Sequence, residues 1–187
     1  MPPKVRITRE DIVNTAIALI RTSGADALNA RAIAASLRCS TQPIFSNFHT
    51  MEELQGATVA AAYEIYLDFL KKESLSGKYP QYKSFGIAYI RFAREEKELF
   101  KLLFMCDREG KELTPTPDFD ASVDLIMNAN GITRESAERM HLEMWACVHG
   151  IATMHATSFL TLEWELISDM LTDVYSGIRV AARESNT

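Results

Sequence analysis

The chain has 187 residues, of which 47% are hydrophobic and 24% charged, a composition that suits one or two packed domains and excludes disordered, collagen-like and mucin-like proteins. With only 8 glycines and 6 prolines it has few turn signals, which argues against an all-β sandwich and favours helix. The net charge of −5 hides an asymmetry, because residues 1–54 hold six Lys or Arg against five Asp or Glu, whereas the rest holds 14 against 20. A mildly basic first third permits a phosphate-binding face there.

The expected compartment is inferred from signal and membrane-spanning segments, and the expected redox state from the cysteines. The first six residues lead into no apolar signal region, and charges interrupt every later hydrophobic stretch before the roughly 18 residues that a spanning helix needs. We therefore expect a cytoplasmic protein without a membrane partner. Its three cysteines, Cys39, Cys106 and Cys147, are too far apart for a CxxC pair and are expected to be small apolar fillers.

The first three predicted helices are closely spaced. Capping signals and apolar periodicity place them at Thr8 to Ser23, Ala30 to about Leu37, and Thr41 to Phe48. Gly24 ends the first helix, Asn29 caps the second, and the third has Ser40 as its expected N-cap. Two short helices joined by three or four residues form the unit that places a second helix in the DNA major groove.

The remaining patterns complete an all-α chain of about nine helices. A capping box at Thr50 and Glu53 opens a helix that runs to near Ser76. The next pattern runs from Pro80 to near Phe104 and reads as two helices with a break around Glu95–Lys97. The last three helices are expected from Asp118 to Ala129, from Thr133 towards Phe159, and from about Leu162 to Ala182. The polar segment from Asp107 to Pro117 is expected to be a flexible loop, because its prolines oppose helix and its apolar content is low.

The stretch from Ile33 to Leu54, IAASLRCSTQPIFSNFHTMEEL, resembles the helix-turn-helix signature of the TetR family of transcriptional repressors. It joins Ile-Ala, a cap Ser, an aromatic residue, a Phe three residues later and Glu-Glu-x-Leu at the family's spacing. With the preceding helix, the resemblance extends from about Ile7. The chain departs from the family where Arg38 and Gln42 replace usual glycines, where Phe45 replaces the usual Tyr, and where Met51 replaces a frequent phosphate-binding Lys.

A second resemblance lies in the C-terminal half. The segment from Trp145 to Gly150 looks like the Trp…His-Gly pattern of one subclass of TetR regulatory domains. The two resemblances together imply an all-helical homodimer with a DNA-binding domain at residues 1–50 and a ligand-binding and dimerisation domain at residues 51–187. They also imply a repressor that releases a palindromic operator on binding a small molecule.

The predicted DNA contacts gather around the third helix. Its polar residues can point outward, while Ile44, Phe45 and Phe48 are its expected inner positions. Gln42 and Asn47 are the best candidates for reading bases, because a carboxamide can pair bidentately with adenine. The full set of expected contacts is Lys4, Arg6, Arg31, Arg38, Ser40, Thr41, Gln42, Pro43, Phe45, Ser46 and Asn47. The alternative is an ordinary solvated polar face.

Two long helices near the C-terminus carry the predicted dimer interface. A glycine inside a helix costs about 1 kcal/mol relative to alanine, so its presence suggests that another backbone approaches closely. The expected interface residues are Ala146, Gly150, Thr153 and Thr157 on the penultimate helix, and Leu166, Met170, Val174, Gly177 and Ile178 on the last one. The alternative is that both helices simply cover their own core.

Aromatic residues and His149 give a candidate ligand site. The expected lining is Tyr66, Tyr89, Phe92, Phe104, Met144, Trp145 and His149, which would suit a flat or aliphatic ligand held by few polar groups. A filled aromatic core would give the same pattern, and both interpretations remain open. No metal site or cofactor is expected, since the two histidines His141 and His149 lack an acidic partner at ligand spacing.

A helical-bundle enzyme or small-molecule carrier without DNA binding is the rival interpretation. The sequence contains no GxSxG, HExxH, P-loop or dinucleotide glycine motif, and no two Glu-x-x-His motifs that could pair. We therefore expect no catalytic residues.

Overall fold

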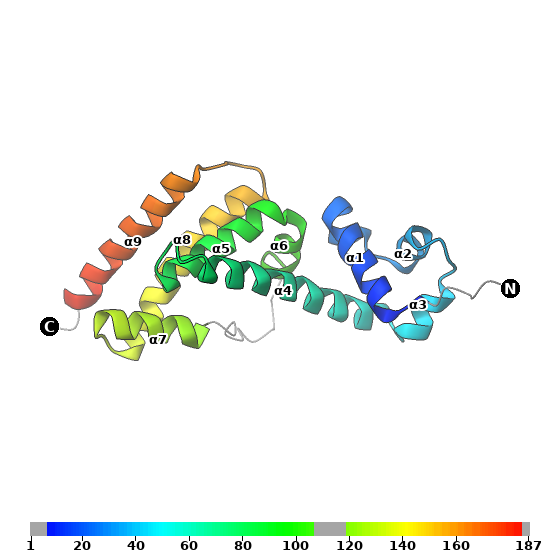
Figure 1. Cartoon of the computed structure of the whole chain (residues 1–187), viewed down its shortest axis with the longest axis horizontal. Coiled ribbons are helices and arrows are strands. Elements are labelled where there is room, and N and C mark those ends of the chain that lie inside the picture. Colours follow the sequence, from blue (N-terminus) through cyan, green and yellow to red (C-terminus); the bar gives the residue numbers. More distant parts are fainter. Residues whose placement is uncertain (1–6, 107–118, 185–187) are drawn as a thin grey trace. The chain divides into compact units, whose positions relative to one another are not determined.

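The structure is a computed structural model that describes residues 7–106 and 119–184, with side chains to residue 182 in the last helix. Within these ranges the regular elements are nine α-helices and one short 3-10 helix, so the predicted all-α fold is confirmed. The loop expected from Asp107 to Pro117 lies outside the described residues. The chain divides into two compact units, residues 1–68 with 96–106, and residues 69–95 with 107–187 (Figure 1).

The first unit is built around three short helices. It contains α1 (Arg9–Ser23), a 3-10 helix (Ala25–Ala27), α2 (Ala30–Ser36), α3 (Gln42–Asn47), most of α4 (Met51–Leu75) and α6 (Lys97–Phe104). Its core is one cluster of buried apolar side chains from α1 to α4, among them Ile12, Ile33, Ile44, Phe48 and Leu54. Each short helix contributes to this shared core, which compensates for the marginal stability of short helices on their own.

Capping interactions decide where α1 and α2 begin and end. Thr8 Oγ1 accepts the N–H of Asp11 at 3.1 Å, and the Asp11 carboxylate accepts the N–H of Thr8 at 2.9 Å, which completes a capping box. Gly24 ends α1 with a φ of +78°. The Asn29 side-chain oxygen accepts the N–H of Ala32 at 2.9 Å. The predicted roles of Thr8, Gly24 and Asn29 are therefore confirmed.

The turn after α2 is closed by a residue in the left-handed region. Arg38 has a φ of +52° and donates its N–H to Ala35 O at 3.1 Å, while Cys39 donates to Ala34 O at 2.9 Å. This is the Schellman pattern, which usually places glycine at the left-handed position. An L residue is strained there by about 1 kcal/mol.

The start of α3 differs from the prediction. Its N-cap is Thr41 rather than Ser40, and the Thr41 side chain makes no capping hydrogen bond. The helix starts at this point because the Thr41 carbonyl accepts the first α-helical hydrogen bond, from the N–H of Phe45 at 3.2 Å. The next helix, α4, begins with half of its predicted capping box: Thr50 Oγ1 accepts the N–H of Glu53 at 3.2 Å, but the Glu53 carboxylate accepts the N–H of His49 at 2.7 Å.

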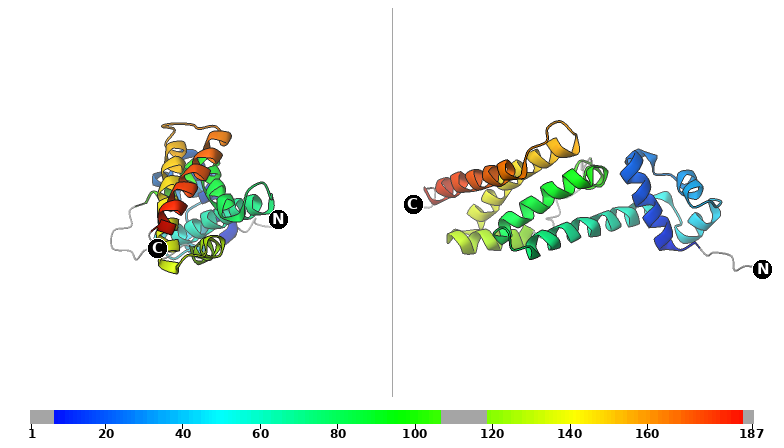
Figure 2. Two further views of the ribbon diagram at one scale, coloured as in Figure 1. Left: turned by 90° about the vertical axis from the view of Figure 1, so that its left-hand side faces the viewer. Right: turned by 45° about the horizontal axis from the view of Figure 1, so that its top comes forward.

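The second unit is a bundle of longer helices. It contains the end of α4, α5 (Gln81–Glu95), α7 (Phe119–Asn130), α8 (Arg134–Ala156) and α9 (Trp164–Glu184), with α8 packed against α5, α7 and α9 (Figure 2). A Cβ atom on Gly86 would lie 3.2 Å from the Val148 side chain and 3.6 Å from that of Leu171. Gly86 therefore allows α5 to approach α8 and α9 closely.

Polar side chains of α5 add ties to α9. Lys83 Nζ donates to Ser168 Oγ at 2.8 Å and to Thr172 Oγ1 at 2.7 Å. The Arg91 guanidinium lies over the Trp164 ring, 4.4 Å from its centroid. These contacts hold the N-terminal half of α9 to α5.

Two adjacent glutamates at the junction of α5 and α6 pair with arginines in different units. Glu96 receives two hydrogen bonds from Arg21 of α1, from Nε at 2.8 Å and from Nη2 at 2.6 Å. Glu95 lies 3.7 Å from Arg91 of α5. The predicted break between two helices at this point is confirmed, because α5 ends at Glu95 and α6 begins at Lys97.

Candidate nucleic-acid interface

The helix α3 has one side in the core of the first unit and the other side in solvent. Ile44 and Phe48 are buried, whereas Gln42, Phe45 and Ser46 are exposed. The prediction that Phe45 points into the core is wrong, since this residue is 46% exposed. With about 3.6 residues per turn, residues four apart share a side of the helix, and Phe45 is rotated away from Ile44 and Phe48.

The two residues predicted to read bases differ in how they are held. The Gln42 side chain is exposed and makes no hydrogen bond with the described residues. The Asn47 side chain is half-buried, and its Nδ2 donates to Pro43 O at 2.8 Å. Ser46 Oγ donates to the Gln42 carbonyl at 2.9 Å. The Asn47 amide group is therefore engaged in holding α3, while the Gln42 carboxamide is available to a ligand.

Two of the predicted cations lie at the two ends of α2, the helix that precedes α3. Arg31 in the first turn of α2 and Arg38 after its end are exposed and form no ion pair with any other described residue. Ser40 is exposed as well, and Thr41 and Pro43 are partly buried. Lys4 and Arg6 lie outside the described residues.

A third cation of this unit, Arg9, was not among the predicted contacts. Its Nη1 donates to Asn47 O at 2.7 Å and to Glu53 Oε1 at 2.9 Å. Its guanidinium carbon lies 3.9 Å from the centroid of the Phe48 ring. No local pattern in the sequence indicates this cluster, because Arg9 is separated from Asn47 by 38 residues and from Glu53 by 44.

The helices α8 and α9 leave apolar side chains exposed. Of the ten large hydrophobic side chains exposed in the described residues, six lie on α8, on α9 or in the loop between them: Leu142, Trp145, Phe159, Leu160, Leu166 and Val180. Of the predicted interface residues, Ala146, Thr157, Leu166 and Gly177 are exposed, and Gly150, Thr153, Met170, Val174 and Ile178 are partly buried. Concentrated apolar exposure of this kind marks interaction surfaces.

The small residues of α8 and α9 face open space within one chain. A Cβ atom on Gly150 or on Gly177 would meet nothing within 4 Å. The Thr153 hydroxyl is buried and makes no hydrogen bond with the described residues. The helix-destabilising glycine at position 150 is thus not explained by close packing inside the chain, in contrast to Gly86.

Three of the predicted ligand residues form one group in the second unit. Tyr89 Oη lies 2.9 Å from His149 Nδ1, and the Trp145 indole stacks on the His149 ring with centroids 4.9 Å apart and planes 15° from parallel. Partial burial lowers the pKa of His149, because it disfavours the charged imidazolium. Trp145 remains 45% exposed at the outer side of this group.

The other predicted ligand residues lie in the packed interiors of the two units. In the first unit, Tyr66 is buried and meets Phe104 edge-on at 5.2 Å. In the second, Phe92 is fully buried against Phe69 at 5.4 Å, and Met144 is buried on α8. The seven residues therefore do not all belong to one unit.

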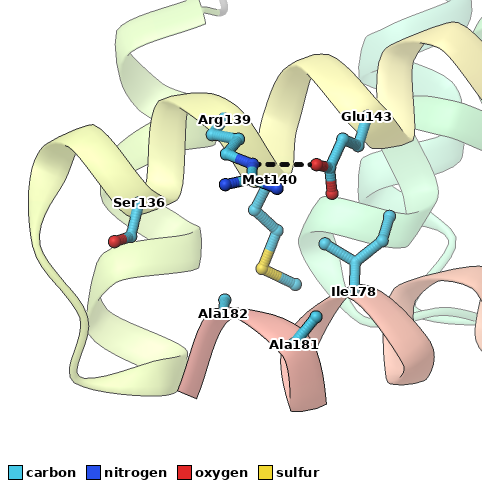
Figure 3. Close-up of a pocket in the computed structure, with 7 residues that line it drawn as sticks. All are labelled: Ser136, Arg139, Met140, Glu143, Ile178, Ala181 and Ala182. Atoms are coloured by element: carbon cyan, nitrogen blue, oxygen red, sulfur yellow. Dashed lines mark hydrogen bonds and ion pairs between the residues drawn. The ribbon is translucent and has the colours of Figure 1, made fainter. Parts of the chain in front are cut away.

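A small pocket lies between α8 and α9, and none of the predicted ligand residues lines it (Figure 3). Its volume is about 40 Å³, and its lining is Ser136, Arg139, Met140, Glu143, Ile178, Ala181 and Ala182. This is room for about three water molecules. Arg139 Nε and Glu143 Oε1 form an ion pair at 3.0 Å beside it. Such a pair four residues apart is common on exposed helices, so the sequence did not single it out.

Residues 7–106 and 119–184 lack two further features. No three His, Cys, Asp or Glu side chains gather there as a possible set of metal ligands. None of the helices in these ranges combines the length and the apolarity needed to cross a bilayer.

Solved structures share this fold despite different sequences. A protein of unknown function from Rhodococcus sp. RHA1 aligns with a TM-score of 0.70 and 18% identity over 96% of this chain and 97% of that one. A protein described as a proposed TetR family transcriptional regulator from Vibrio parahaemolyticus aligns with a TM-score of 0.64 and 14% identity over 90% of this chain and 96% of that one. The proposed regulatory protein SCO4313 aligns with a TM-score of 0.64 and 20% identity over 89% of this chain and 94% of that one. These likenesses define the fold class.

The family follows from the C-terminal half. Residues 82–174 match the family model of the tetracyclin repressor-like C-terminal domain, a range that extends from α5 into α9 and includes the segment from Trp145 to Gly150. The chain belongs to the TetR family of transcriptional regulators. The resemblance seen in the sequence is therefore confirmed. No curated protein matches the sequence.

Proposed function

We propose that the protein is a DNA-binding repressor that acts in the cytoplasm as a homodimer and releases a palindromic operator on binding a small, largely apolar ligand. Residues 1–50 are the DNA-binding domain in this proposal, and residues 51–187 bind the ligand and dimerise. Each copy inserts one α3 helix into the major groove of one half-site. The protein has no catalytic role in this scheme.

The observation that carries the proposal is the two-sided environment of α3. Its apolar side is anchored by Ile44 in the core, while Gln42 and Ser46 present polar groups to solvent. Exposed Arg31 and Arg38 lie at the two ends of the preceding helix, where they can contact phosphates. Because available cations are few, we expect a shallow salt dependence that corresponds to a handful of phosphates per dimer.

The exposed face of α8 and α9 supports the homodimer. Leu166 is 49% exposed, and Gly150 and Gly177 face open space where another helix can approach. A second copy that brings the same two helices would complete a four-helix interface with twofold symmetry. Such a pair displays two α3 helices, as a palindromic operator requires.

The group of Trp145, His149 and Tyr89 supports a ligand site in the second unit. Partly exposed rings and one hydrogen-bonding pair suit a flat apolar molecule. The helix α4 is continuous from the first unit into the second, so it can carry a displacement to the DNA-binding end. Release requires that the ligand binds the DNA-free conformation more tightly than the DNA-bound one.

Footprinting on the DNA directly upstream of the protein's own gene tests the proposal. The expected result is protection of a near-palindrome with two half-sites about one helical turn or more apart. A small-molecule carrier or a bundle enzyme would protect nothing. The same footprint in the presence of a panel of small apolar compounds should be lost for the effector alone.

Replacing Gln42 with Ala sharpens the test. We expect the affinity for the protected site to fall by about 1–3 kcal/mol for a lost bidentate base contact, with dimerisation unchanged. Gln81→Ala is the matched control, because Gln81 is also an exposed glutamine but lies at the start of α5. Equal affinity of wild type and Gln42→Ala in a gel-shift titration would refute the role of Gln42.

A further inference from the structure

The cluster around Arg9 links the end of α3 to α1 and α4. Arg9 is the first residue of α1, and Glu53 lies in the first turn of α4. The Arg9 guanidinium donates to the last residue of α3, at Asn47 O, and to Glu53, and it covers the Phe48 ring. Glu53 in turn accepts the N–H of His49, which follows α3 by two residues. One guanidinium and one carboxylate therefore join three helices.

The helix α3 depends on such contacts more than a longer helix would. It has six residues, and its N-cap residue Thr41 makes no side-chain capping bond. The last carbonyls of a helix have no partner within the helix, and Arg9 supplies one for Asn47 at 2.7 Å. The buried Phe48 ring beneath the guanidinium limits how far this end can shift.

We propose that Arg9 and Glu53 are positioning residues that fix the orientation of α3 for base reading, and that Arg9 does not serve as a phosphate contact. This inference rests on the proposed function. Arg9 is one of the six cations that make the N-terminal third basic, and charge alone would assign it to the DNA backbone. The Arg9 guanidinium instead forms an ion pair with Glu53 within the protein.

The Glu53 carboxylate is suited to this role. The pKa of Glu53 is lowered, first by the backbone N–H of His49 and then by Arg9, so the group stays ionised at neutral pH. A carboxylate at this place repels phosphate, and it is favourable for DNA binding only if it acts through the protein. The sign of its effect on DNA affinity therefore separates positioning from phosphate contact.

The experiment compares Glu53→Gln with Glu52→Gln. Both substitutions remove one negative charge in the first turn of α4, but Glu52 is exposed and makes no contact with Arg9. Two labelled duplexes are titrated, one with the footprinted upstream site and one with the same bases in shuffled order. If Glu53 positions α3, Glu53→Gln lowers the ratio of specific to shuffled affinity by about threefold, a size typical of exposed ion pairs, whereas Glu52→Gln leaves the ratio unchanged.

The opposite outcome overturns the inference. If Arg9 contacts a phosphate, freeing it from Glu53 strengthens binding to both duplexes, and the ratio stays constant. An unchanged ratio with unchanged affinities also overturns it. If wild type binds neither duplex, the proposed function itself fails, and the inference fails with it.

Arg9→Lys gives an independent readout. Lysine keeps the charge and can still contact a phosphate, but it has no planar group to lay over the Phe48 ring as the Arg9 guanidinium does. Positioning predicts a fall of about fivefold in the specific-to-shuffled ratio, with the slope of log affinity against log salt unchanged. Retained specificity in Arg9→Lys would contradict the inference, and a thermal unfolding midpoint close to wild type shows that the variant is folded.

Discussion

The fold leaves two surfaces open, and they differ in chemistry. The α3 surface presents polar side chains such as Gln42 and Ser46, with the exposed cation Arg38 in the turn before it, whereas the face of α8 and α9 presents apolar side chains such as Leu142 and Leu166. Polar groups on α3 can replace water by hydrogen bonds to base edges, and the apolar face gains most by leaving water altogether. Exposure alone therefore does not define the partner of a surface, since the chemistry of the exposed side chains decides what it can bind.

The largest effect is expected from a charge on the apolar face. Leu166→Glu would place a carboxylate twice in the proposed twofold interface, and burying an unpaired charge costs about 3–5 kcal/mol. We expect the dissociation constant of the dimer to rise by at least about a hundredfold, as measured by sedimentation equilibrium. Leu75→Glu at the end of α4, where the leucine is 77% exposed, is the control and should leave the dimer intact. A stable Leu166→Glu dimer would place the interface elsewhere.

A glycine pair gives a smaller but cleaner comparison. Gly56 on α4 and Gly150 on α8 both lie inside helices, and an added Cβ meets nothing within 4 Å at either position. Each change to alanine should raise the intrinsic stability of its helix by about 1 kcal/mol. Only Gly150→Ala should weaken dimerisation, because in the proposed dimer its methyl group would enter the space of the partner's helix. The same effect of both variants in sedimentation and urea unfolding would argue against a close approach at Gly150.

The smallest effect concerns the strained turn before α3. Arg38→Gly should stabilise the protein by about 0.5–1 kcal/mol, because glycine adopts positive φ without strain. It should also lower the salt slope of DNA binding by about one per copy through loss of a cation. Arg31→Ala removes the same charge without relieving strain, so it should change the slope and not the urea midpoint. A lower midpoint for Arg38→Gly than for wild type would contradict this account of the turn.

The sequence predicted the fold well where local signals decide it. Thr8, Gly24 and Asn29 act through contacts within a few residues, and these rules apply without knowledge of the tertiary structure. The helix break near Glu95 follows from local pattern in the same way.

The errors fall where local and tertiary effects compete. Ser40 is a reasonable cap by residue type, but the first helical hydrogen bond of α3 is accepted by Thr41 O, so the helix starts one residue later. Phe45 was assigned to the core by its chemistry, although its place on the helix turns it towards solvent.

Long-range contacts could not be inferred from the sequence at all. The Arg9 cluster joins residues far apart in the chain, and no local pattern indicates which acid will meet which guanidinium. Similarly, a glycine inside a helix suggests a close approach, but sequence does not distinguish Gly86, which is approached within the chain, from Gly150, which is not. The assignments of DNA, ligand and dimer residues stay predictions for the same reason, since each depends on a second molecule.

The adjacent glutamates between α5 and α6 have an electrostatic consequence. Glu95 pairs with Arg91 inside the second unit, and its neighbour Glu96 pairs with Arg21 inside the first, so two consecutive residues are each held by charge to their own unit. An electrolyte that screens charges would weaken both ion pairs while leaving the apolar cores untouched.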